Sequence, residues 1–243
     1  TTPSEIVDRY HKEFLDNWEK LAISWDLYTS TGTDNHSEVT HDVFMKLFEK
    51  GHIDKRSSEQ FYDEDAGRFL PDRYIEGVCP HCEYSEARGD QCEACGRTLD
   101  PEELIKPISK ISGSEPTLKE TEHFYLRLSD FEEPLSEWLS GREGWRNHVL
   151  NFSKGWIEEG LHDRAITRDL DWGIEVPVEG IGEGKKIYVW FEAVIGYLSA
   201  AKEWSKNNGL EDDWKKWWSN PDSRSVYFIG KDNIPFHTII WPA

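Results

Sequence analysis

The 243-residue sequence contains no long apolar run, and none of its stretches approaches the roughly 20 apolar residues that a membrane-spanning helix needs. A signal peptide is not visible either, because the N-terminus is polar. The chain begins without Met and ends on Trp241-Pro242-Ala243 in mid-pattern. We therefore expect a fragment of a longer protein.

Basic residues are scarce. Lys and Arg number 28 against 47 Asp and Glu, which gives a net charge of −19. Because phosphate contacts need Lys and Arg, this charge argues against non-specific nucleic-acid binding and favours a solvated acidic surface. A nucleic acid held by a local basic patch, or by parts outside this chain, stays open.

Cysteine is absent outside residues 79–95, so long-range disulfides are excluded. Inside that stretch, two C-x-x-C pairs are separated by nine residues. Two such pairs complete a tetrahedral Zn²⁺ site with no open position, which predicts one structural ion per chain. The alternatives are two disulfides or free thiols, but the pattern favours a reducing, cytoplasmic compartment. The predicted ligands are Cys79, Cys82, Cys92 and Cys95.

A second stretch repeats this pattern without cysteine. Ser109-Lys110-Ile111-Ser112-Gly113 has the spacing of Cys92-Glu93-Ala94-Cys95-Gly96, with serine replacing each cysteine. Serine does not hold zinc in this way. The pattern predicts a second, metal-free knuckle, and a chance match over five residues is an equal alternative.

Helical periodicity and capping signals predict a helix from Thr2-Pro3-Ser4-Glu5 to about Ala22, with one buried face. A second helix, over residues 39–48, should end at Gly51. Between them and the C-terminal part we expect short strands and turns over 53–77, a strand at 123–128, and helices at 134–140 and 145–156.

The C-terminal third predicts a βαβ unit with a strand at 187–190, a helix at 191–206 and a strand at 226–229. Parallel strands end at the same sheet edge, so Trp190 and the turn 230–232 would face one crevice. One face of the helix carries mostly small residues, which leaves room for a ligand. The bland alternative is ordinary strand–helix packing in a core. The residues of that face are Ala193, Gly196, Tyr197 and Ala200.

Several motifs resemble those of the methionyl-tRNA synthetases, a class I family, and together they cover nearly the whole chain. The serine pattern also fits, because some relatives carry two metal knuckles and others one. The motifs are Tyr188-Val189-Trp190-Phe191-Glu192-Ala193, Ile195-Gly196-Tyr197, Phe228-Ile229-Gly230-Lys231-Asp232-Asn233, Phe236-His237-Thr238, Trp241-Pro242-Ala243, Phe69-Leu70-Pro71-Asp72-Arg73, the cysteine pairs, Glu122-His123-Phe124 and Thr167-Arg168-Asp169.

The resemblance implies an α/β fold, namely part of a Rossmann-type catalytic domain interrupted by a connective-peptide insertion with a zinc knuckle. We expect residues 1–36 to close the first Rossmann half, 37–186 to form the insertion with its knuckle at about 77–97, and 187–243 to open the second half. The family's ATP signatures, His-x-Gly-His and Lys-Met-Ser-Lys-Ser, are absent from the sequence. We therefore expect this piece alone not to form adenylate at a useful rate.

The resemblance also implies an activity, in which methionine is activated with ATP and Mg²⁺ and passed to tRNA(Met). Gly230 and Asp232 would bind the ribose of ATP, and Arg168 would be a charged catalytic partner at the pocket. A thioether packs well on aromatic rings, in agreement with the remaining residues. By resemblance, the methionine pocket would comprise Trp190, Ala193, Tyr197, Asn233, Phe236 and His237.

Two positions depart from the family pattern. Glu192 stands where many relatives have aspartate, and Val194, which we expect against the pocket, stands where many have proline. Alternative interpretations are a core role for His237 and surface charge pairing for Arg168. A different function class, a non-catalytic zinc-bearing RNA-binding or scaffold module, also stays open. A leucine-, valine- or isoleucine-specific relative is disfavoured by Trp190 and the adjacent Phe236 and His237.

Overall fold

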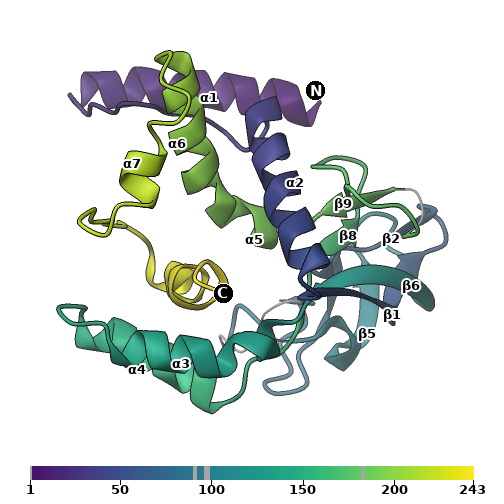
Figure 1. Cartoon of the computed structure of the whole chain (residues 1–243). Coiled ribbons are helices and arrows are strands. Elements are labelled where there is room, and N and C mark those ends of the chain that lie inside the picture. The colour runs from purple at the N-terminus through teal and green to yellow at the C-terminus, as the bar shows by residue number, and fades with distance from the viewer. Residues whose placement is uncertain (1, 90–91, 96–98, 182–183) are drawn as a thin grey trace.

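The computed structural model describes residues 2–89, 92–95, 99–181 and 184–243. Its helices gather on one side of the chain and its strands on the other (Figure 1). The helices are α1 (Pro3–Lys20), α2 (Asp34–Glu49), α3 (Glu132–Ser140), α4 (Asn147–Glu158), α5 (Val189–Glu192), α6 (Gly196–Asn207) and α7 (Lys215–Trp218). A five-residue π-helix, Phe236–Ile240, lies near the C-terminus.

All strand pairings among the described residues are antiparallel. The strands are β1 (Ile53–Asp63), β2 (Arg68–Phe69), β3 (Ile75–Val78), β4 (Ala87–Arg88), β5 (Ile105–Ser109), β6 (Thr117–Leu126), β7 (Arg164–Ala165), β8 (Thr167–Asp169) and β9 (Lys185–Ile187). They form sheets in the orders β2-β1-β6-β7, β4-β3-β5 and β8-β9.

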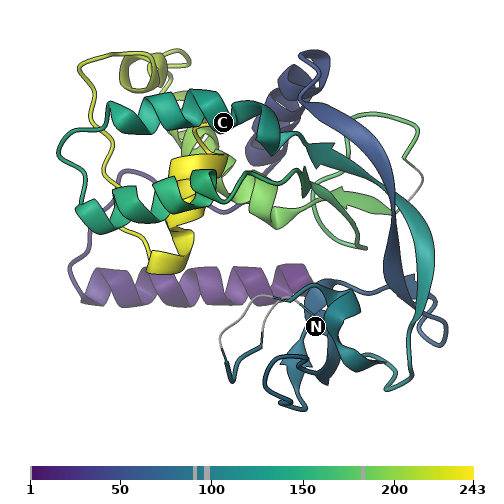
Figure 2. The ribbon, with the colours of Figure 1, turned by 90° about the horizontal axis from the view of Figure 1, so that it is seen from below.

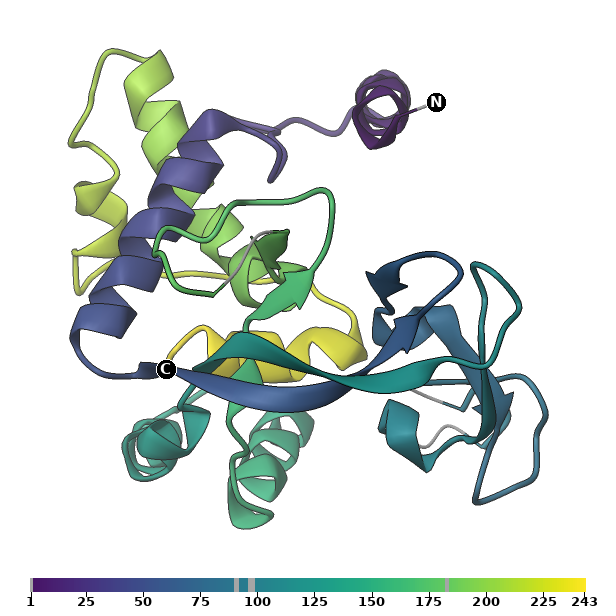
Figure 3. The same cartoon turned by 90° about the vertical axis from the view of Figure 1, so that its right-hand side faces the viewer.

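The pair β1–β6 is the longest feature of the chain, with ten residue pairs in unbroken register from Ile53↔Leu126 to Tyr62↔Thr117. Figure 3 shows it as a twisted ribbon that leads from the helices to a small module formed by β2 to β5. We call this module, residues 63–114, the tip. The ribbon therefore separates two hydrophobic cores.

The main core joins helices and strands from all parts of the sequence. Phe44 on α2 is fully buried, and its ring meets Phe124 on β6 and Phe191 on α5 edge to face at 5.6 and 6.3 Å. Ile239 of the π-helix is also fully buried in this core. Figure 2 shows the π-helix, in yellow, lying near α3 and α4. The C-terminal segment is thus anchored to the same core as α2.

The second core lies in the tip and is small. Phe61, Leu70 and Ile75 pack there with two of the cysteines, Cys79 and Cys92, which are fully buried. So few buried apolar side chains give limited stability, and small folds of this kind commonly rely on metals or cross-links.

Several predicted helices are confirmed. Thr2 and Glu5 form the expected capping box at the start of α1. Gly51, just after α2, has φ +80°, and Gly160, just after α4, has φ +90°, the left-handed conformation that ends helices on glycine. The predicted helix from 191 is present as α5, a short 3₁₀ turn and α6, so it begins two residues earlier than expected.

The predicted buried face of α1 is wrong, because no residue of this helix is buried. Val7, Tyr10 and Phe14 keep 39%, 44% and 48% of their surface exposed. Amphipathic spacing reports that a helix has an apolar side, but burial also requires an element that packs against it. Figure 1 shows α1 at the edge of the molecule.

The predicted parallel βαβ unit is also wrong. Strand β9 ends at Ile187, and Tyr188 caps the helix that starts at Val189. Residues 226–229 form no strand, and Phe228 is 97% exposed. Apolar and β-branched composition favours a strand only where a neighbouring strand supplies backbone partners. None of the described strands pairs with 226–229.

The strand predictions in the first half were too short. Residues 53–63 form one continuous strand rather than short strands and turns, and β6 begins at Thr117, well before residue 123. Continuous polar runs, residues 54–60 in β1 and 119–123 in β6, fill the middle of both strands, so neither has a long apolar signal. Among the described residues, no helix combines the length and apolarity that crossing a bilayer requires.

Candidate active site and metal centre

The four cysteines meet in the tip, where their sulfur atoms all lie within 4.8 Å of one another. Cys79 Sγ is 3.9 Å from Cys95 Sγ, and Cys82 Sγ is 3.6 Å from Cys92 Sγ. These separations are far longer than a disulfide bond of about 2.05 Å. They match the spacing of about 3.8 Å that tetrahedral Zn–S bonds of about 2.3 Å impose. The donor set therefore fits a metal ion.

Local backbone geometry prepares these thiols for a cation. The N–H of His81 donates to Cys79 Sγ at 3.4 Å. N–H donation from Cys95 outweighs the effect of burial and, with a second bond from Ala94, lowers the pKa of Cys92 to about 7. An N–H bond from Tyr84 opposes it, but burial and hydrogen bonds with the other thiols raise the pKa of Cys82 to about 12. A thiolate is the form that coordinates metal, so of these two cysteines it is Cys92 whose surroundings favour that form.

The predicted pocket residues of the C-terminal third come together in space. The rings of Trp190, at the start of α5, and Phe236, at the start of the π-helix, stack with centroids 4.9 Å apart. Tyr197 on α6 lies beside His237, and their Oη and Nε2 atoms are 2.8 Å apart. Segments over 40 residues apart in sequence therefore build one aromatic surface.

His237 has a defined role in this arrangement. Its Nδ1 lies 2.9 Å from the carbonyl oxygen of Asn233, which can only accept a hydrogen bond. Nδ1 must therefore carry a proton, and in the neutral ring Nε2 is left to accept from the Tyr197 hydroxyl. The predicted Asn233 thus contributes through its backbone, by fixing the tautomer of His237.

Sequence reasoning missed one member of this group. The ring of Tyr227 lies 5.0 Å from that of Tyr197 and 5.1 Å from that of His237. Tyr227 stands in the segment predicted as a strand, so its side chain was assigned to a core. We call Trp190, Tyr197, Tyr227, Phe236 and His237 the aromatic cluster.

The aromatic cluster is open to solvent. Trp190 is 48% exposed and Tyr197 is 39% exposed, although both rings have aromatic neighbours. Exposed apolar patches of this kind are typical of surfaces that bind a ligand or a partner. Ala193, which follows α5 directly, is half-buried between the helix turns that carry these two side chains.

Val194 does not belong to the cluster. It is buried and lines an apolar cavity of about 240 Å³ together with Val43 of α2 and Trp241, and no cluster residue lines that cavity. The expectation that Val194 sits against the pocket is therefore wrong. The helical turn at 193–195 directs its side chain to the wall of this cavity, beside Phe191 and Ile195.

Gly230 and Asp232 lie in the turn before the π-helix. A Cβ on Gly230 would be 2.5 Å from Asp232 Oδ1, so a larger residue there would displace this carboxylate. Asp232 is exposed and has no ion pair among the described residues. Its carboxylate therefore lies next to Gly230 with oxygen atoms that can accept hydrogen bonds.

Arg168 on β8 is held by three groups. Its Nη1 donates to the carbonyl oxygens of Ala165 and Thr167 at 3.0 and 2.9 Å, and its guanidinium lies 4.1 Å above the ring of Tyr188. It pairs with no carboxylate of the described residues, so surface charge pairing does not explain it. Tyr188 caps α5, and Arg168 therefore lies beside the helix that carries Trp190.

A buried network under the cluster was also missed. His36 of α2 is 2.6 Å from Glu192 Oε2 through Nε2 and 2.8 Å from Ser199 Oγ through Nδ1, and all three side chains are buried. It ties α2 to α5 and α6 at the turn between Trp190 and Tyr197. Glu192, one of the two departures, thus has a structural partner that no local pattern reveals.

A second buried network lies between β6, β8 and β9. Asp169 pairs with Lys185 Nζ at 2.6 Å and with His123 Nε2 at 3.2 Å. Burial lowers the pKa of His123, because its effect outweighs the opposite effect of the hydrogen bond with Asp169. Burial opposes ionisation of Asp169 too, but hydrogen bonds from His123 and Lys185 lower its pKa. The charge in this network is thus the Lys185–Asp169 pair.

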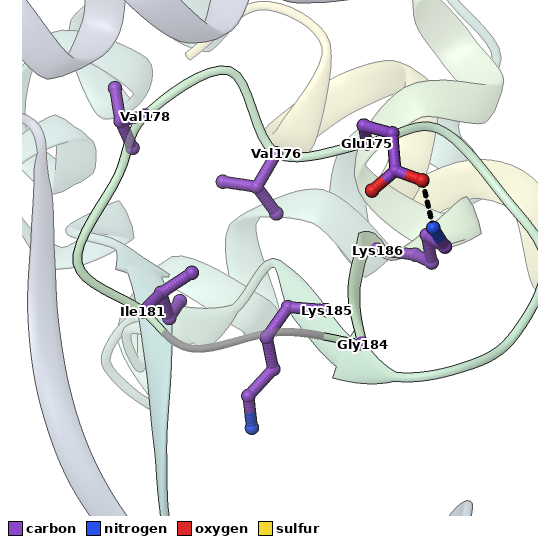
Figure 4. Close-up of a pocket in the computed structure, with 7 residues that line it drawn as sticks. All are labelled: Glu175, Val176, Val178, Ile181, Gly184, Lys185 and Lys186. Atoms are coloured by element: carbon purple, nitrogen blue, oxygen red, sulfur yellow. Dashed lines mark hydrogen bonds and ion pairs between the residues drawn. The ribbon is translucent and has the colours of Figure 1, made fainter.

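A separate cavity of about 320 Å³ lies beside β9. Figure 4 shows its wall, where Glu175 and Lys186 form an ion pair and the side chain of Lys185 points away from that pair. Lys185 pairs with Asp169 instead. None of the predicted site residues lines this cavity. Its lining is Glu175, Val176, Val178, Ile181, Gly184, Lys185 and Lys186.

Comparison with known proteins gives concordant matches. The family model described as "tRNA synthetases class I (M)" matches residues 1–243. The chain is 55% identical over 242 residues to a methionine–tRNA ligase of Dehalococcoides mccartyi strain CBDB1, and 52% identical over 250 residues to one of Roseiflexus sp. strain RS-1. It is covered completely in both, but spans only 43% and 42% of their lengths.

Solved structures of low sequence identity share the fold. Mycobacterium tuberculosis methionyl-tRNA synthetase in complex with methionyl-adenylate superposes with a TM-score of 0.67 at 21% identity, covering 100% of this chain and 41% of that one. The free-state structure of the same enzyme gives 0.63 and covers 99% and 42%.

Proposed function

We propose, on the premise that this chain belongs to the class I (M) tRNA synthetases, that it forms part of the catalytic region of a methionine–tRNA ligase. The family match confirms the resemblance of its motifs and the α/β class I fold. The chain spans less than half the length of the curated relatives it matches, so the activity is proposed for the whole protein.

The observation that carries the proposal is the aromatic cluster. Trp190 and Phe236 present stacked rings, and a methionine thioether gains contact energy at such rings without needing a hydrogen-bond donor. The Tyr197 hydroxyl donates its hydrogen bond to His237, so its oxygen faces a ligand as an acceptor. Ala193, the smallest side chain on this wall, leaves space for the substrate backbone.

The proposed reaction has two steps. The carboxylate of methionine attacks the α-phosphate of ATP, which gives methionyl-adenylate and pyrophosphate, and the methionyl group then passes to the 3′ end of tRNA(Met). Positioning and charge stabilisation dominate such chemistry. We infer that Asp232 accepts a hydrogen bond from the ATP ribose and that Gly230 permits close approach. Arg168 would supply positive charge, and Mg²⁺ would accompany ATP.

We infer that the four cysteines hold one structural Zn²⁺, which cross-links the tip. The same reduced cysteines support a cytoplasmic location. We further propose that residues 37–186 are an insertion between two parts of the catalytic domain. The support concerns its middle part, where the chain leaves the main core along β1 at Ile53 and returns along β6 to Leu126, with the tip between them.

Methionine-dependent pyrophosphate exchange by the full-length protein tests the proposal. Trp190→Ala and His237→Ala should each raise the KM for methionine by roughly tenfold, because each removes contacts of about 1.4 kcal/mol. Trp217→Ala is the matched control, since Trp217 is 65% exposed on α7 and has no ring partner among the described aromatics. Unchanged kinetics in both cluster variants would remove the cluster from the substrate site.

A further inference from the structure

The backbone of the first cysteine loop occurs three times in the tip. In residues 79–84, the N–H of Cys79 donates to the carbonyl of Tyr84, and the N–H of Glu83 donates back to Cys79 O at 3.0 Å. Residues 109–114 repeat both bonds, from Ser109 N–H to Ser114 O at 2.9 Å and from Gly113 N–H to Ser109 O at 2.9 Å. The serine pattern seen in the sequence is thus a true knuckle.

The third copy, residues 63–68, was not visible in the sequence. The N–H of Gly67 donates to Asp63 O at 2.8 Å, and Asp63 pairs with Arg68 between β1 and β2. In all three loops the fifth residue has a left-handed φ, of +61° at Glu83, +80° at Gly113 and +67° at Gly67. This conformation is uncommon, so its recurrence at one position marks a shared backbone.

The first side chain of each loop accepts hydrogen bonds from its own backbone. Cys79 Sγ accepts from His81 N–H at 3.4 Å, and Ser109 Oγ accepts from Ile111 N–H at 3.1 Å. Asp63 Oδ1 accepts from Ala66 N–H at 2.9 Å. Burial also agrees, because Asp63 and Ser109 are buried like Cys79, and Ser112 is exposed like Cys82.

The loops at 63–68 and 109–114 meet as the two cysteine loops do. Ser109 Oγ donates to Asp63 Oδ2 at 2.5 Å, and Ser112 Oγ donates to the same oxygen at 2.7 Å. Both serine positions that correspond to cysteines therefore point at one central atom. Hydrogen bonds, first of all from Ser109, lower the pKa of Asp63 to about 2, so that atom is an anionic oxygen.

We propose that these two loops form a second knuckle pair in which the Asp63 carboxylate takes the place of a metal ion. In the cysteine pair a cation is surrounded by anionic ligands. Here the charges are reversed, because an anion is surrounded by hydroxyl and N–H donors. The carboxylate oxygens are fully engaged, and hydroxyl groups are poor zinc ligands, so this half of the tip is held without metal.

Converting the site back tests the geometry. The variant with Asp63→Cys, Ala66→Cys, Ser109→Cys and Ser112→Cys has four thiols at the positions equivalent to the natural ones. It should bind two zinc ions per chain where the parent binds one, and its cobalt-substituted form should double the thiolate-to-metal absorbance. A folded variant that retains one zinc and takes up no second would overturn the proposal.

A measurement on the unmodified sequence covers the case in which that variant does not fold. Amide hydrogen exchange is followed in the full-length protein before and after zinc is stripped with a chelator. Protection should fall in 79–84 and persist in 109–114. Asp63→Asn should do the reverse, lowering protection in 109–114 by about tenfold with zinc content unchanged. Joint loss of protection in both regions on zinc removal would contradict a metal-free second pair.

Discussion

The cysteine site and the aromatic cluster are built in opposite ways. The four cysteines come from one short stretch, their sulfurs lie within 4.8 Å of one another, and an ion bound by all four would have no coordination position left for a substrate. The cluster draws on α5, α6, the segment before Gly230 and the π-helix, and its rings remain half exposed. A closed site whose ligands are all from the protein is suited to a structural role, and an open site with exposed rings is suited to binding a ligand.

The largest expected effect comes from opening the closed site. Replacing Cys92 by Ser removes a buried ligand whose loop already favours the thiolate, so zinc affinity should fall more than about 100-fold, beyond the loss typical of supporting residues around a metal. Zinc content after dialysis and the melting temperature measure this. Ser112→Ala is the control for zinc content alone, since it lies outside the cysteine set but donates to Asp63 in the other loop pair. Full zinc retention in Cys92→Ser would contradict the ligand assignment.

The second largest effect is expected from the buried His36–Glu192 pair beneath the aromatic cluster. His36→Ala leaves Glu192 buried without its partner, which should cost about 3 kcal/mol in the free energy of unfolding. A double-mutant cycle with Glu192→Ala, followed by denaturant unfolding, gives the coupling between the two side chains. Strictly additive single effects would show that the pair does not interact in solution.

A smaller effect is expected within the cluster. Tyr227→Ala removes a ring that contacts both Tyr197 and His237, so the KM for methionine should rise by about 2- to 10-fold in full-length protein, the value of one aromatic pair. Tyr227→Phe keeps the ring and should behave like the parent. If Phe and Ala variants are equally impaired, the hydroxyl and not the ring is what matters.

The smallest expected effect concerns the stability of the protein at acidic pH. Asp63 has a folded pKa of about 2 against an ordinary value of 3.8, so its contribution to stability is complete above about pH 4 and is lost as pH falls toward 2. Asp63→Asn should flatten the pH dependence of unfolding in that window alone. As pH falls, cysteine–metal bonding is lost before the Asp63 contribution, because thiolates take up protons at a higher pH than Asp63 does. Coincident loss of protection in both halves of the tip would erase the distinction between them.

Local chemistry in the sequence predicted local structure well. The cysteine spacing, the capping box at Thr2 and the glycine that ends α2 depend on residues a few positions apart, and all three are present. The serine knuckle was also visible, because its pattern is contained in five residues. Its partner at Asp63 was not, since an aspartate, an alanine and a glycine at that spacing resemble any surface turn.

Contacts between distant segments could not be predicted from pattern. Residues 226–229 have strand-like composition, yet no described strand lies beside them. The apolar face of α1 has the right period, yet no residue of the helix is buried, although Trp18 contacts the rings of Trp25 and Tyr28. Trp190 and Tyr197 were placed at a ligand site by the βαβ argument, which the structure overturns, and Phe236 and His237 were proposed because their motifs resemble a family. Tyr227 and His36 escaped even that, because their roles depend on rings and carboxylates that arrive from other elements.

The ribbon of β1 and β6 has a consequence for how such a protein changes over generations. Ile53 and Leu126 at one end belong to the main core, and Phe61 at the other belongs to the tip. Between them the strands are joined by backbone bonds, which are indifferent to side-chain identity, and by exposed side-chain pairs such as Lys55–Glu122 and Ser57–Glu120. Substitutions that trade cysteine for carboxylate in the tip are therefore insulated from the aromatic face, and the two ends are free to evolve at separate rates.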